Sequence, residues 1–217
     1  NTVIAKADAN AKTVYVHSLR YNTVTKKLDI QSRLMVINNA VPEDSTTRSV
    51  VDKWNGKAHE LLQQQGFEPC ELLDSLSIPL DGTEASIRTK QTNLGAAICQ
   101  SMISALATPV DCAIMNSGSI RIDDVLTGYV SQYDVFRVLP FGGKIVTRQF
   151  PGYLIDSLLK TNYRRERNGS FLQYTGITLR DTSYYIKGKL LAKDNTLYTV
   201  AINDYLGMGL QPGLELL

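Results

Sequence analysis

One long amphipathic helix divides this sequence into two parts of different character, and this division restricts the fold more than any other feature. Pro42 is followed by Glu43 and Asp44, and a proline followed by acids is typical of the first turn of a helix. Apolar side chains then recur at spacings of three and four, which predicts one largely apolar face; they are Val50, Val51, Trp54, Ala58, Leu61 and Leu62. Gly66 ends the pattern. We therefore expect a helix over residues 42–66 that connects two structural units.

The segments on either side of this helix predict a mixed sheet. Before it, residues 13–22 and 27–38 alternate polar and apolar side chains around a turn, which indicates two strands. After it, strands and helices alternate in the middle of the chain, and strands dominate its end. The expected fold class is therefore α/β, or more closely α+β, with helices covering a mixed sheet.

The second part is expected to contain six strands and three helices. Strands are predicted over 70–80 (broken by Pro79), 110–116, 144–150, 171–181, 184–194 and 196–204; helices are predicted from Thr92 or Asn93 to Leu106, from Ser131 to just before Pro140, and from Pro151 to Leu159. The strand over 110–116 is short and mostly apolar, so we expect it in the middle of the sheet.

Composition excludes few function classes but gives no support to a nucleic-acid binder. Lysine and arginine together number 23 and the acids 21, for a net charge of +2. The basic run over 162–168 lacks interleaved aromatic residues and is interpreted as a solvated loop. No apolar stretch approaches the roughly 18 residues of a membrane span. The chain begins with Asn1 rather than Met, which indicates processing or truncation.

Residue patterns alone reveal no catalytic cluster. The two histidines, His17 and His59, have no neighbours in metal-ligand spacing and are interpreted as surface or hydrogen-bonded side chains. The adjacent acids Asp123 and Asp124 lie in a turn-rich loop and are interpreted as solvated. The three cysteines, at positions 70, 99 and 112, are expected to be buried structural thiols, and their odd number leaves at least one unpaired.

Two arginines and one phenylalanine are candidates for ligand binding. Arg121 follows the strand over 110–116 and Arg88 precedes a predicted helix, where a planar guanidinium can bind two phosphate oxygens. Phe141 lies between Pro140 and two glycines, which offer nothing to pack on its ring. It could stack on a planar base, although the residues alone favour a core aromatic beside a turn.

Five motifs in a fixed order extend this interpretation. They are PLDGTEASIRTKQTNLG (79–95), NSGSIR (116–121), VLPFGGK (138–144), PGYLIDSLLK (151–160) and GSFLQYTGI (169–177). From Pro69 to Tyr205 the chain resembles the carboxyl-terminal domain of the 5′-nucleotidase family, which includes periplasmic UDP-sugar hydrolases and cell-surface ecto-5′-nucleotidases. Residues 5–38 resemble the end of the family's amino-terminal metallophosphoesterase domain. The resemblance implies residual strands over 1–41, a linker helix over 42–66 and a nucleotide-binding domain over 67–217.

The resemblance also implies a set of substrate-binding residues. These are Arg88, Asn116, Arg121, Phe141, Gly169 and Tyr205. The two arginines would face phosphate or ribose, and the asparagine would bond the ligand. The two aromatic residues would sandwich the base.

The chemistry of the family is expected to lie outside this chain. The family's amino-terminal domain carries two divalent metal ions, held by Asp, His and Asn, and a catalytic Asn–His pair. Those motifs should lie before Ala5, and none is present here. The fragment is therefore expected to be inactive alone, with no catalytic residue and no cofactor of its own. The whole protein would hydrolyse nucleoside 5′-phosphates or related phosphoesters, such as UDP-sugars, when a hinge closes the two domains.

The sequence also departs from the family pattern. Ala96 and Gln100 stand where family members often carry Gly-Asn-Leu and then an acid, and the loop after Tyr205 lacks the usual aspartate, with Gln211 as the nearest polar residue. The alternative interpretation is a catalytically silent binding or interaction module with a decayed nucleotide site. The expected partners are a nucleotide or nucleoside and the protein's own amino-terminal domain, with no nucleic acid and no membrane span. Family members are periplasmic, secreted or surface-bound, so the same placement is expected here.

Overall fold

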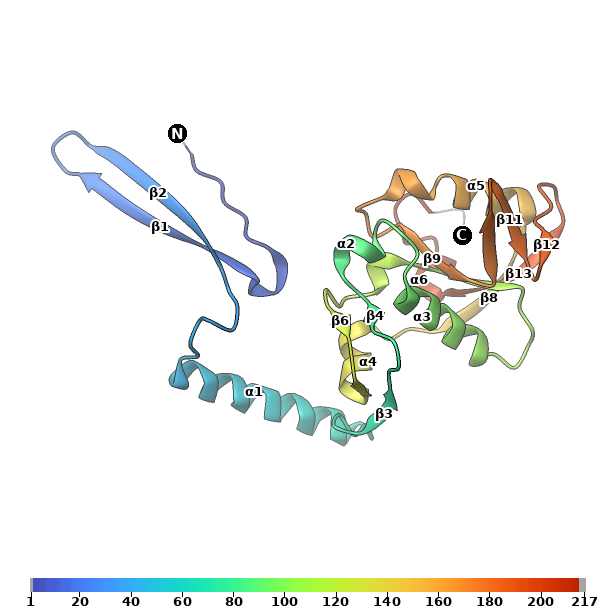
Figure 1. The fold of residues 1–217 in the computed structure, drawn as a ribbon, viewed down its shortest axis with the longest axis horizontal. Coiled ribbons are helices and arrows are strands. Elements are labelled where there is room, and N and C mark those ends of the chain that lie inside the picture. The colour runs from blue at the N-terminus through green and yellow to red at the C-terminus, as the bar shows by residue number, and fades with distance from the viewer. Residues whose placement is uncertain (1, 215–217) are drawn as a thin grey trace. The chain divides into compact units, whose positions relative to one another are not determined.

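A computed structural model describes residues 2–214, and the chain separates after Gln64 into two compact units. The first unit contains the strands β1 (Thr13–Asn22) and β2 (Lys27–Val36) and the helix α1 (Ser45–Gln64), which Figure 1 shows in blue to cyan. The two strands form an antiparallel hairpin that pairs over its full length. Both predicted strands and the long helix are therefore present, and the helix belongs to the first unit.

The helix α1 begins three residues later than predicted. The side chain of Asp44 accepts a hydrogen bond from the backbone N–H of Thr47 at 2.7 Å, which is the geometry of an N-cap. Pro42 and Glu43 therefore lie before the helix. No residue of α1 is buried, so its apolar face is not covered by the first unit.

The second unit contains the remaining elements. Its helices are α2 (Glu84–Ile87), α3 (Asn93–Ser104), α4 (Gln132–Val138), α5 (Gly152–Lys160) and α6 (Asp204–Gly207), with short 3₁₀ turns η2 (Ser117–Ser119) and η3 (Asn162–Arg165). Its strands are β3 (Leu72–Ser75), β4 (Leu80–Asp81), β5 (Cys112–Asn116), β6 (Val125–Leu126), β7 (Tyr129–Ser131), β8 (Ile145–Pro151), β9 (Leu172–Thr175), β10 (Ile177–Arg180), β11 (Ser183–Ile186), β12 (Lys189–Leu190) and β13 (Leu197–Asn203).

A four-stranded sheet in the order β8–β13–β5–β9 forms the centre of this unit. The strands β13 and β5 are parallel, with Val200 opposite Cys112. The outer strands β8 and β9 run antiparallel to their neighbours. The mixed sheet confirms the predicted fold class, and the central position of β5 confirms the expectation for residues 110–116.

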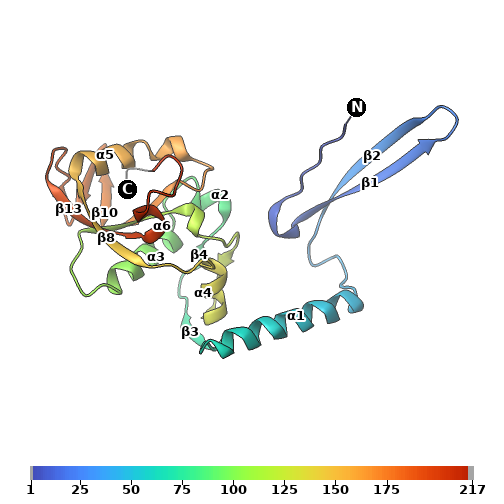
Figure 2. The ribbon, with the colours of Figure 1, turned by 180° about the vertical axis from the view of Figure 1, so that it is seen from behind.

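Helices cover both faces of this sheet, so its core has two layers. In β5, Cys112 and Ile114 pack on the side of α5, whereas Ala113 and Met115 pack on the side of α3. This alternation follows from the two-residue repeat of a strand, which sends successive side chains to opposite faces. Figures 1 and 2 show α5 and α3 on opposite sides of the strands. All five residues of β5 are buried, and this rigid centre positions the polar side chains at its end.

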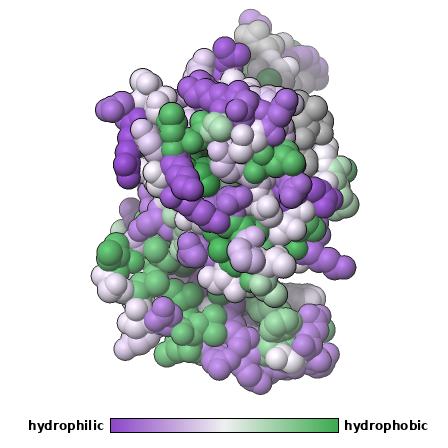
Figure 3. Space-filling model, turned by 90° about the vertical axis from the view of Figure 1, so that its right-hand side faces the viewer, coloured by the Kyte–Doolittle hydropathy of each residue, from purple (hydrophilic) through white to green (hydrophobic). Residues whose placement is uncertain are grey.

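The surface of the second unit is mixed in character. On the face shown in Figure 3, hydrophilic and hydrophobic side chains are interspersed, as expected for a surface in water. Among the residues that the structure describes, no helix combines the length and apolar character needed to cross a bilayer.

Three details differ from the sequence-based expectations. Cys70 is exposed, whereas Cys99 and Cys112 are buried as predicted; Cys70 directly precedes β3, whose residues are all exposed. Three expected strands are each split in two: 70–80 into β3 and β4, 171–181 into β9 and β10, and 184–194 into β11 and β12. The charged run over 162–168 is not simply a solvated loop, because Arg165 donates to the carbonyl of Leu158 at 3.1 Å near the end of α5.

Candidate functional site

The ends of three strands bring polar residues to one edge of the central sheet. Because β5 and β13 are parallel, their last residues, Asn116 and Asn203, lie at the same edge. The antiparallel strand β8 begins there, with Ile145 opposite Asn203. Ligands of open α/β sheets commonly bind outside the carboxyl ends of parallel strands, so a ligand-binding site is expected at this edge.

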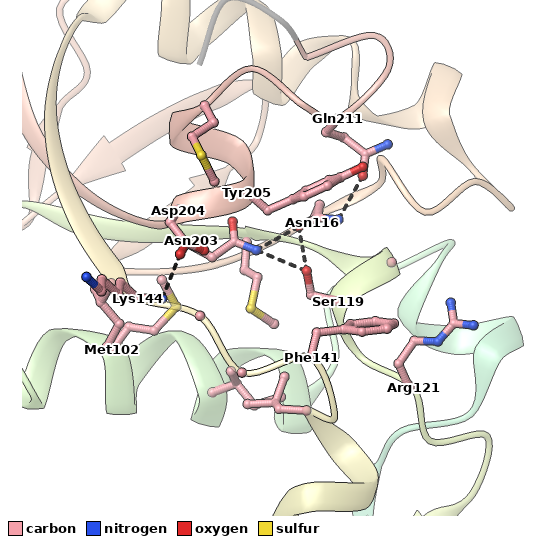
Figure 4. Close-up of a pocket in the computed structure, with 18 of the residues that line it drawn as sticks. Met102, Asn116, Ser119, Arg121, Phe141, Lys144, Asn203, Asp204, Tyr205 and Gln211 are labelled. Atoms are coloured by element: carbon pink, nitrogen blue, oxygen red, sulfur yellow. Dashed lines mark hydrogen bonds between the residues drawn. The ribbon is translucent and has the colours of Figure 1, made fainter.

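A cavity of about 750 Å³ opens at this edge. Figure 4 shows the side chains that line it, which come from α3, β5 and the segment after it, the loop before β8 and the start of that strand, the end of β13, and α6 with the loop that follows. The size is within the range of small-molecule sites in proteins. Four of the six predicted binding residues line this cavity: Asn116, Arg121, Phe141 and Tyr205.

Asn116 is the centre of a buried polar cluster at the back of the cavity. It is 2% exposed, and its Nδ2 donates to Oε1 of Gln211 at 2.8 Å. Its Oδ1 accepts from Oγ of Ser119 at 2.8 Å and from Nδ2 of Asn203 at 3.1 Å. Asn203 Nδ2 also donates to Ser119 Oγ at 3.0 Å. These hydrogen bonds hold the side chains of the cluster in one arrangement and give the cavity a polar wall (Figure 4). Oδ1 of Asn203 is buried without a hydrogen-bond partner among the described residues.

Phe141 is exposed at the mouth of the cavity. It follows α4, whose start is held by the predicted capping box between Ser131 and Asp134. Burial raises the pKa of Asp134, but the hydrogen bonds from Ser131 have the larger combined effect and lower that pKa overall. The ring is 69% exposed, so the interpretation as a core aromatic was wrong. Gly142 and Gly143 have φ of +65° and +110°, and a turn of this kind carries the ring outward.

Asp204 holds the Phe141 loop against α6. Its Oδ2 accepts from the backbone N–H of Lys144 at 2.9 Å, and its own N–H donates to the Lys144 carbonyl at 2.9 Å. A Cβ on Gly143 would lie 2.8 Å from Oδ1 of Asp204, so only glycine fits this close approach. The position of the Phe141 loop is thus linked to the end of β13.

Tyr205 and Arg121 complete the cavity. Tyr205, on α6, is 40% exposed, and Figure 4 shows its ring and that of Phe141 on opposite sides of the cavity. The Arg121 guanidinium carbon lies 5.5 Å from the centre of the Phe141 ring, a distance typical of a cation–π contact. Two aromatic faces with a cation at one end can bind a planar group that carries an anion.

Arg88 and Gly169 do not line the cavity. The sequence placed Arg88 before a helix, and in the structure it also directly follows the short helix α2. Its guanidinium pairs with the carboxylate of Glu84 at 2.6 Å. The carbonyl of Gly169 accepts from the N–H of Gly118 at 2.7 Å, and Gly118 does line the cavity. Gly169 therefore supports the wall from behind, and direct ligand contacts by Arg88 and Gly169 stay predictions.

Sequence reasoning missed several residues of the site. Asn203 and Asp204 close the apolar strand β13 in the same way that Asn116 closes β5, and this similarity was a usable signal. What the sequence does not show is that these two strands are parallel neighbours. Met102 and Met208 also line the cavity. Met102 lies in the helix predicted to end at Leu106, and Met208 lies in the loop after Tyr205; neither was predicted to be a binding residue.

The described residues do not form a metal centre. Among residues 2–214, no three His, Cys, Asp or Glu side chains come together in an arrangement that could hold a metal ion. The residues present therefore do not fit the pair of divalent ions that the resemblance implies for the family.

Comparison with known proteins gives consistent results. The model of the family described as 5′-nucleotidase, C-terminal domain, matches residues 75–212. The 5′-nucleotidase of Bos taurus is 30% identical over 155 residues, which cover 66% of this chain and 26% of that protein; the 5′-nucleotidase of Homo sapiens is 28% identical over the same shares. The crystal structure of a 5′-nucleotidase precursor from Thermus thermophilus aligns with a TM-score of 0.72 and 21% identity, over 91% of this chain and 41% of that one. The chain spans about a quarter of the length of these curated relatives.

Proposed function

Because the chain belongs to the 5′-nucleotidase family, as a carboxyl-terminal domain, we propose that its cavity binds the nucleoside part of a nucleotide. The observation that carries this proposal is the pair of exposed rings, Phe141 and Tyr205, on opposite sides of the cavity. An exposed ring that lines a cavity offers a face on which a planar base can stack. A base stacked between them would cover both, at a gain of about 1–3 kcal/mol for each base stacked.

The polar groups around the rings match the remaining parts of a nucleotide. Arg121 lies at one end of the cavity and can present its planar fork to phosphate oxygens. The cluster around Asn116 faces the space between the rings, where the polar edge of a base or the hydroxyl groups of a ribose would lie. Arg88 would join the phosphate contacts only after leaving Glu84, with which it pairs in this structure.

For the whole protein we propose hydrolysis of nucleoside 5′-phosphates. Water would add to phosphorus, the bond between phosphorus and the 5′ oxygen would break, and the products would be a nucleoside and inorganic phosphate. The groups that carry out this reaction would lie outside this chain. This chain would contribute binding and orientation alone, and we expect it to be inactive by itself.

The location that we propose for the whole protein is outside the cytoplasm: secreted, periplasmic or at the cell surface. One relative, which is 28% identical, is named snake venom 5′-nucleotidase, and this name supports the secreted form.

The proposal is tested by titrating the 217-residue chain with AMP in a calorimeter. The variant Phe141→Ala should bind AMP roughly tenfold more weakly or worse, because about 1.4 kcal/mol corresponds to a factor of ten. The matched control is Tyr163→Ala: Tyr163 is also exposed and also carries a nearby arginine, Arg164, at 5.7 Å, but it lies outside the cavity and should not matter.

Two results would contradict the proposal. Equal affinity of the wild type and Phe141→Ala would exclude stacking between the two rings. Absence of binding to any nucleoside monophosphate at millimolar concentration would favour the alternative, a catalytically silent module with a decayed nucleotide site.

A further inference from the structure

One carboxylate connects the segments that carry the two rings of the proposed base site. Asp204 directly precedes Tyr205 on α6. Its Oδ2 accepts from the backbone N–H of Lys144 and its own N–H donates to the Lys144 carbonyl, both at 2.9 Å. Lys144 is the last residue before β8, at the end of the loop that carries Phe141. We call this pair of hydrogen bonds the Asp204 clasp, and Figure 4 shows it between the two segments.

The loop that carries Phe141 needs support from another element. Gly142 and Gly143 both have positive φ, at +65° and +110°, and glycine has more backbone freedom than any other residue. The Phe141 ring is 69% exposed, so packing of the ring itself gives the loop little support. The clasp is therefore well placed to hold the ring in one position.

The loop is shaped to let the carboxylate come close. A Cβ on Gly143 would lie 2.8 Å from Oδ1 of Asp204, whereas a Cβ on Gly142 would meet nothing within 4 Å. Any other side chain at position 143 would thus push the carboxylate away from Lys144. Position 143 has a steric reason to be glycine that position 142 does not share, and that reason is Asp204.

A base that stacks between two rings depends on how those rings are held. If the clasp were open, the segment with Phe141 would sample several positions, and binding would have to order it again. Ordering a loop on binding costs conformational entropy and weakens affinity, so a loop that is already ordered binds more tightly. A clasp between the two segments therefore favours a base without contacting it.

We propose that Asp204 is a positioning residue for nucleotide binding, which holds the ring of Phe141 opposite that of Tyr205. This inference rests on the proposed function, since it needs a base between the two rings. It goes further because it gives a role in affinity to a carboxylate whose charge is wrong for binding phosphate. Asp204 also lines the cavity, so the test must separate positioning from direct contact with the ligand.

A double-mutant cycle on the 217-residue chain makes this separation. The affinity for AMP is measured by calorimetry for the wild type, Asp204→Ala, Phe141→Ala and the variant with both changes. Asp204→Ala alone should bind AMP roughly fivefold more weakly. When Phe141 is already alanine, the clasp has no ring to position, so adding Asp204→Ala should weaken binding by less than about twofold.

The conservative variant Asp204→Asn should restore binding. Its side-chain oxygen can still accept from the N–H of Lys144, although the negative charge is gone. We expect its AMP affinity to stay within about twofold of that of the wild type. A direct contact that needs the charge of the carboxylate would be lost in this variant.

Asp111→Ala is the matched control for a purely structural effect. Asp111 donates its N–H to the carbonyl of Thr199 and accepts from the N–H of Thr199 through Oδ2, both at 2.7 Å. It makes the same pair of bonds as the clasp, at the end of β13 away from the cavity, and it also pairs with Lys187 at 2.9 Å. Its loss should lower the midpoint of thermal unfolding at least as much as Asp204→Ala, yet leave AMP affinity within about twofold of that of the wild type.

Each result decides the inference. Unchanged affinity in Asp204→Ala, an equal loss in the Phe141→Ala background, a loss in Asp204→Asn as large as in Asp204→Ala, or a similar loss in Asp111→Ala would overturn it. In all four cases, AMP binding by the wild type and its loss in Phe141→Ala leave the proposed function standing. Failure of the wild type to bind AMP would overturn both together.

Discussion

At the scale of single residues, Asn116 shows how a polar side chain can be placed by its neighbours. It ends a strand whose five residues are all buried, and its side-chain amide bonds to residues from three separate segments, at Ser119, Asn203 and Gln211. A buried amide without such partners would be costly. This wall of the cavity therefore depends partly on Asn203 and Gln211, which are distant from Asn116 in the sequence.

The three cysteines should differ in reactivity. Burial raises the pKa of both Cys99 and Cys112 to about 12, whereas Cys70 is exposed. Because the thiolate is the reactive form, the native protein at pH 8 should react with Ellman's reagent rapidly at one thiol. In denaturant it should react at three.

The variant Cys70→Ser is the control for this prediction. It should show almost no rapid reaction when native and two reactive thiols when unfolded. Rapid reaction of two or three thiols in the native wild type would mean that the core around Cys99 or Cys112 opens readily.

Single residues were predicted from sequence with uneven success. The end of β5 could be found because an apolar run stops at Asn116, and Phe141 could be singled out because glycines follow it. Its exposure could not be derived, since local sequence does not show whether another segment covers a ring. The exposure of Cys70 was missed for the same reason.

At the scale of elements, one buried glutamine connects β9 to the segment between α2 and α3. Gln173 has 0% exposure. Its Nε2 donates to the carbonyls of Ile87 and Lys90, each at 2.7 Å, and its Oε1 accepts from the N–H of Thr92 at 3.0 Å. A single side chain thus satisfies three backbone groups where α3 begins. Gly95 packs directly on this side chain and leaves no room for a Cβ.

Replacing this glutamine should destabilise the fold strongly. In Gln173→Leu three backbone groups lose their partner, two of them in buried hydrogen bonds, and each loss at a buried group costs about 1–3 kcal/mol. We expect the free energy of unfolding to fall by about 3 kcal/mol or more, measured by urea denaturation followed by circular dichroism.

The control for this variant is Gln149→Leu, on β8, the other outer strand of the same sheet. Gln149 is exposed, so its replacement should change the free energy of unfolding by roughly 0.5 kcal/mol or less. Similar losses in both variants would show that the side-chain hydrogen bonds of Gln173 do not carry the effect.

Among the elements, periodicity predicted the long ones and missed the short ones. The helices α1, α3 and α5 and the strands β1, β2, β8 and β13 all lie where their patterns indicated. The helix α2 has only four residues and β6 only two, too few for any repeat to show. The pairing of β5 with β13 could not be predicted, because no local signal specifies which distant strand lies alongside.

At the scale of the whole molecule, the chain consists of two units that differ in how many buried core residues they contain. Both core clusters consist of residues between Ile87 and Leu214. No residue up to Gln64 whose burial is described is buried. A connector helix between two structural units was expected from its sequence, and the division after Gln64 places that helix with the first unit. The proposed limits of the family's domains, at 41 and 66, remain predictions.

The second unit should fold by itself. A chain of residues 65–217 keeps every residue of both core clusters, so it should unfold cooperatively with a midpoint within a few degrees of that of the 217-residue chain. A chain of residues 1–64 should show no cooperative transition, because it has no core to melt. Scanning calorimetry of all three chains measures this directly.

A different result would revise the description of the molecule. If residues 65–217 melted far below the full chain, or without a cooperative transition, the first unit would contribute stability that its exposed side chains do not explain.

The order of the central sheet has a consequence for how the protein is made. The strand β13 lies between β8 and β5, yet it follows both of them in the chain and leaves the ribosome after them. Until it arrives, β8 and β5 have unpaired inner edges, and such edges are open to wrong partners. The cavity, which needs the ends of β5 and β13 together, cannot form in the nascent chain before β13 has been synthesised. Formation of the cavity thus requires the sheet to close around β13, a slow, long-range event in folding.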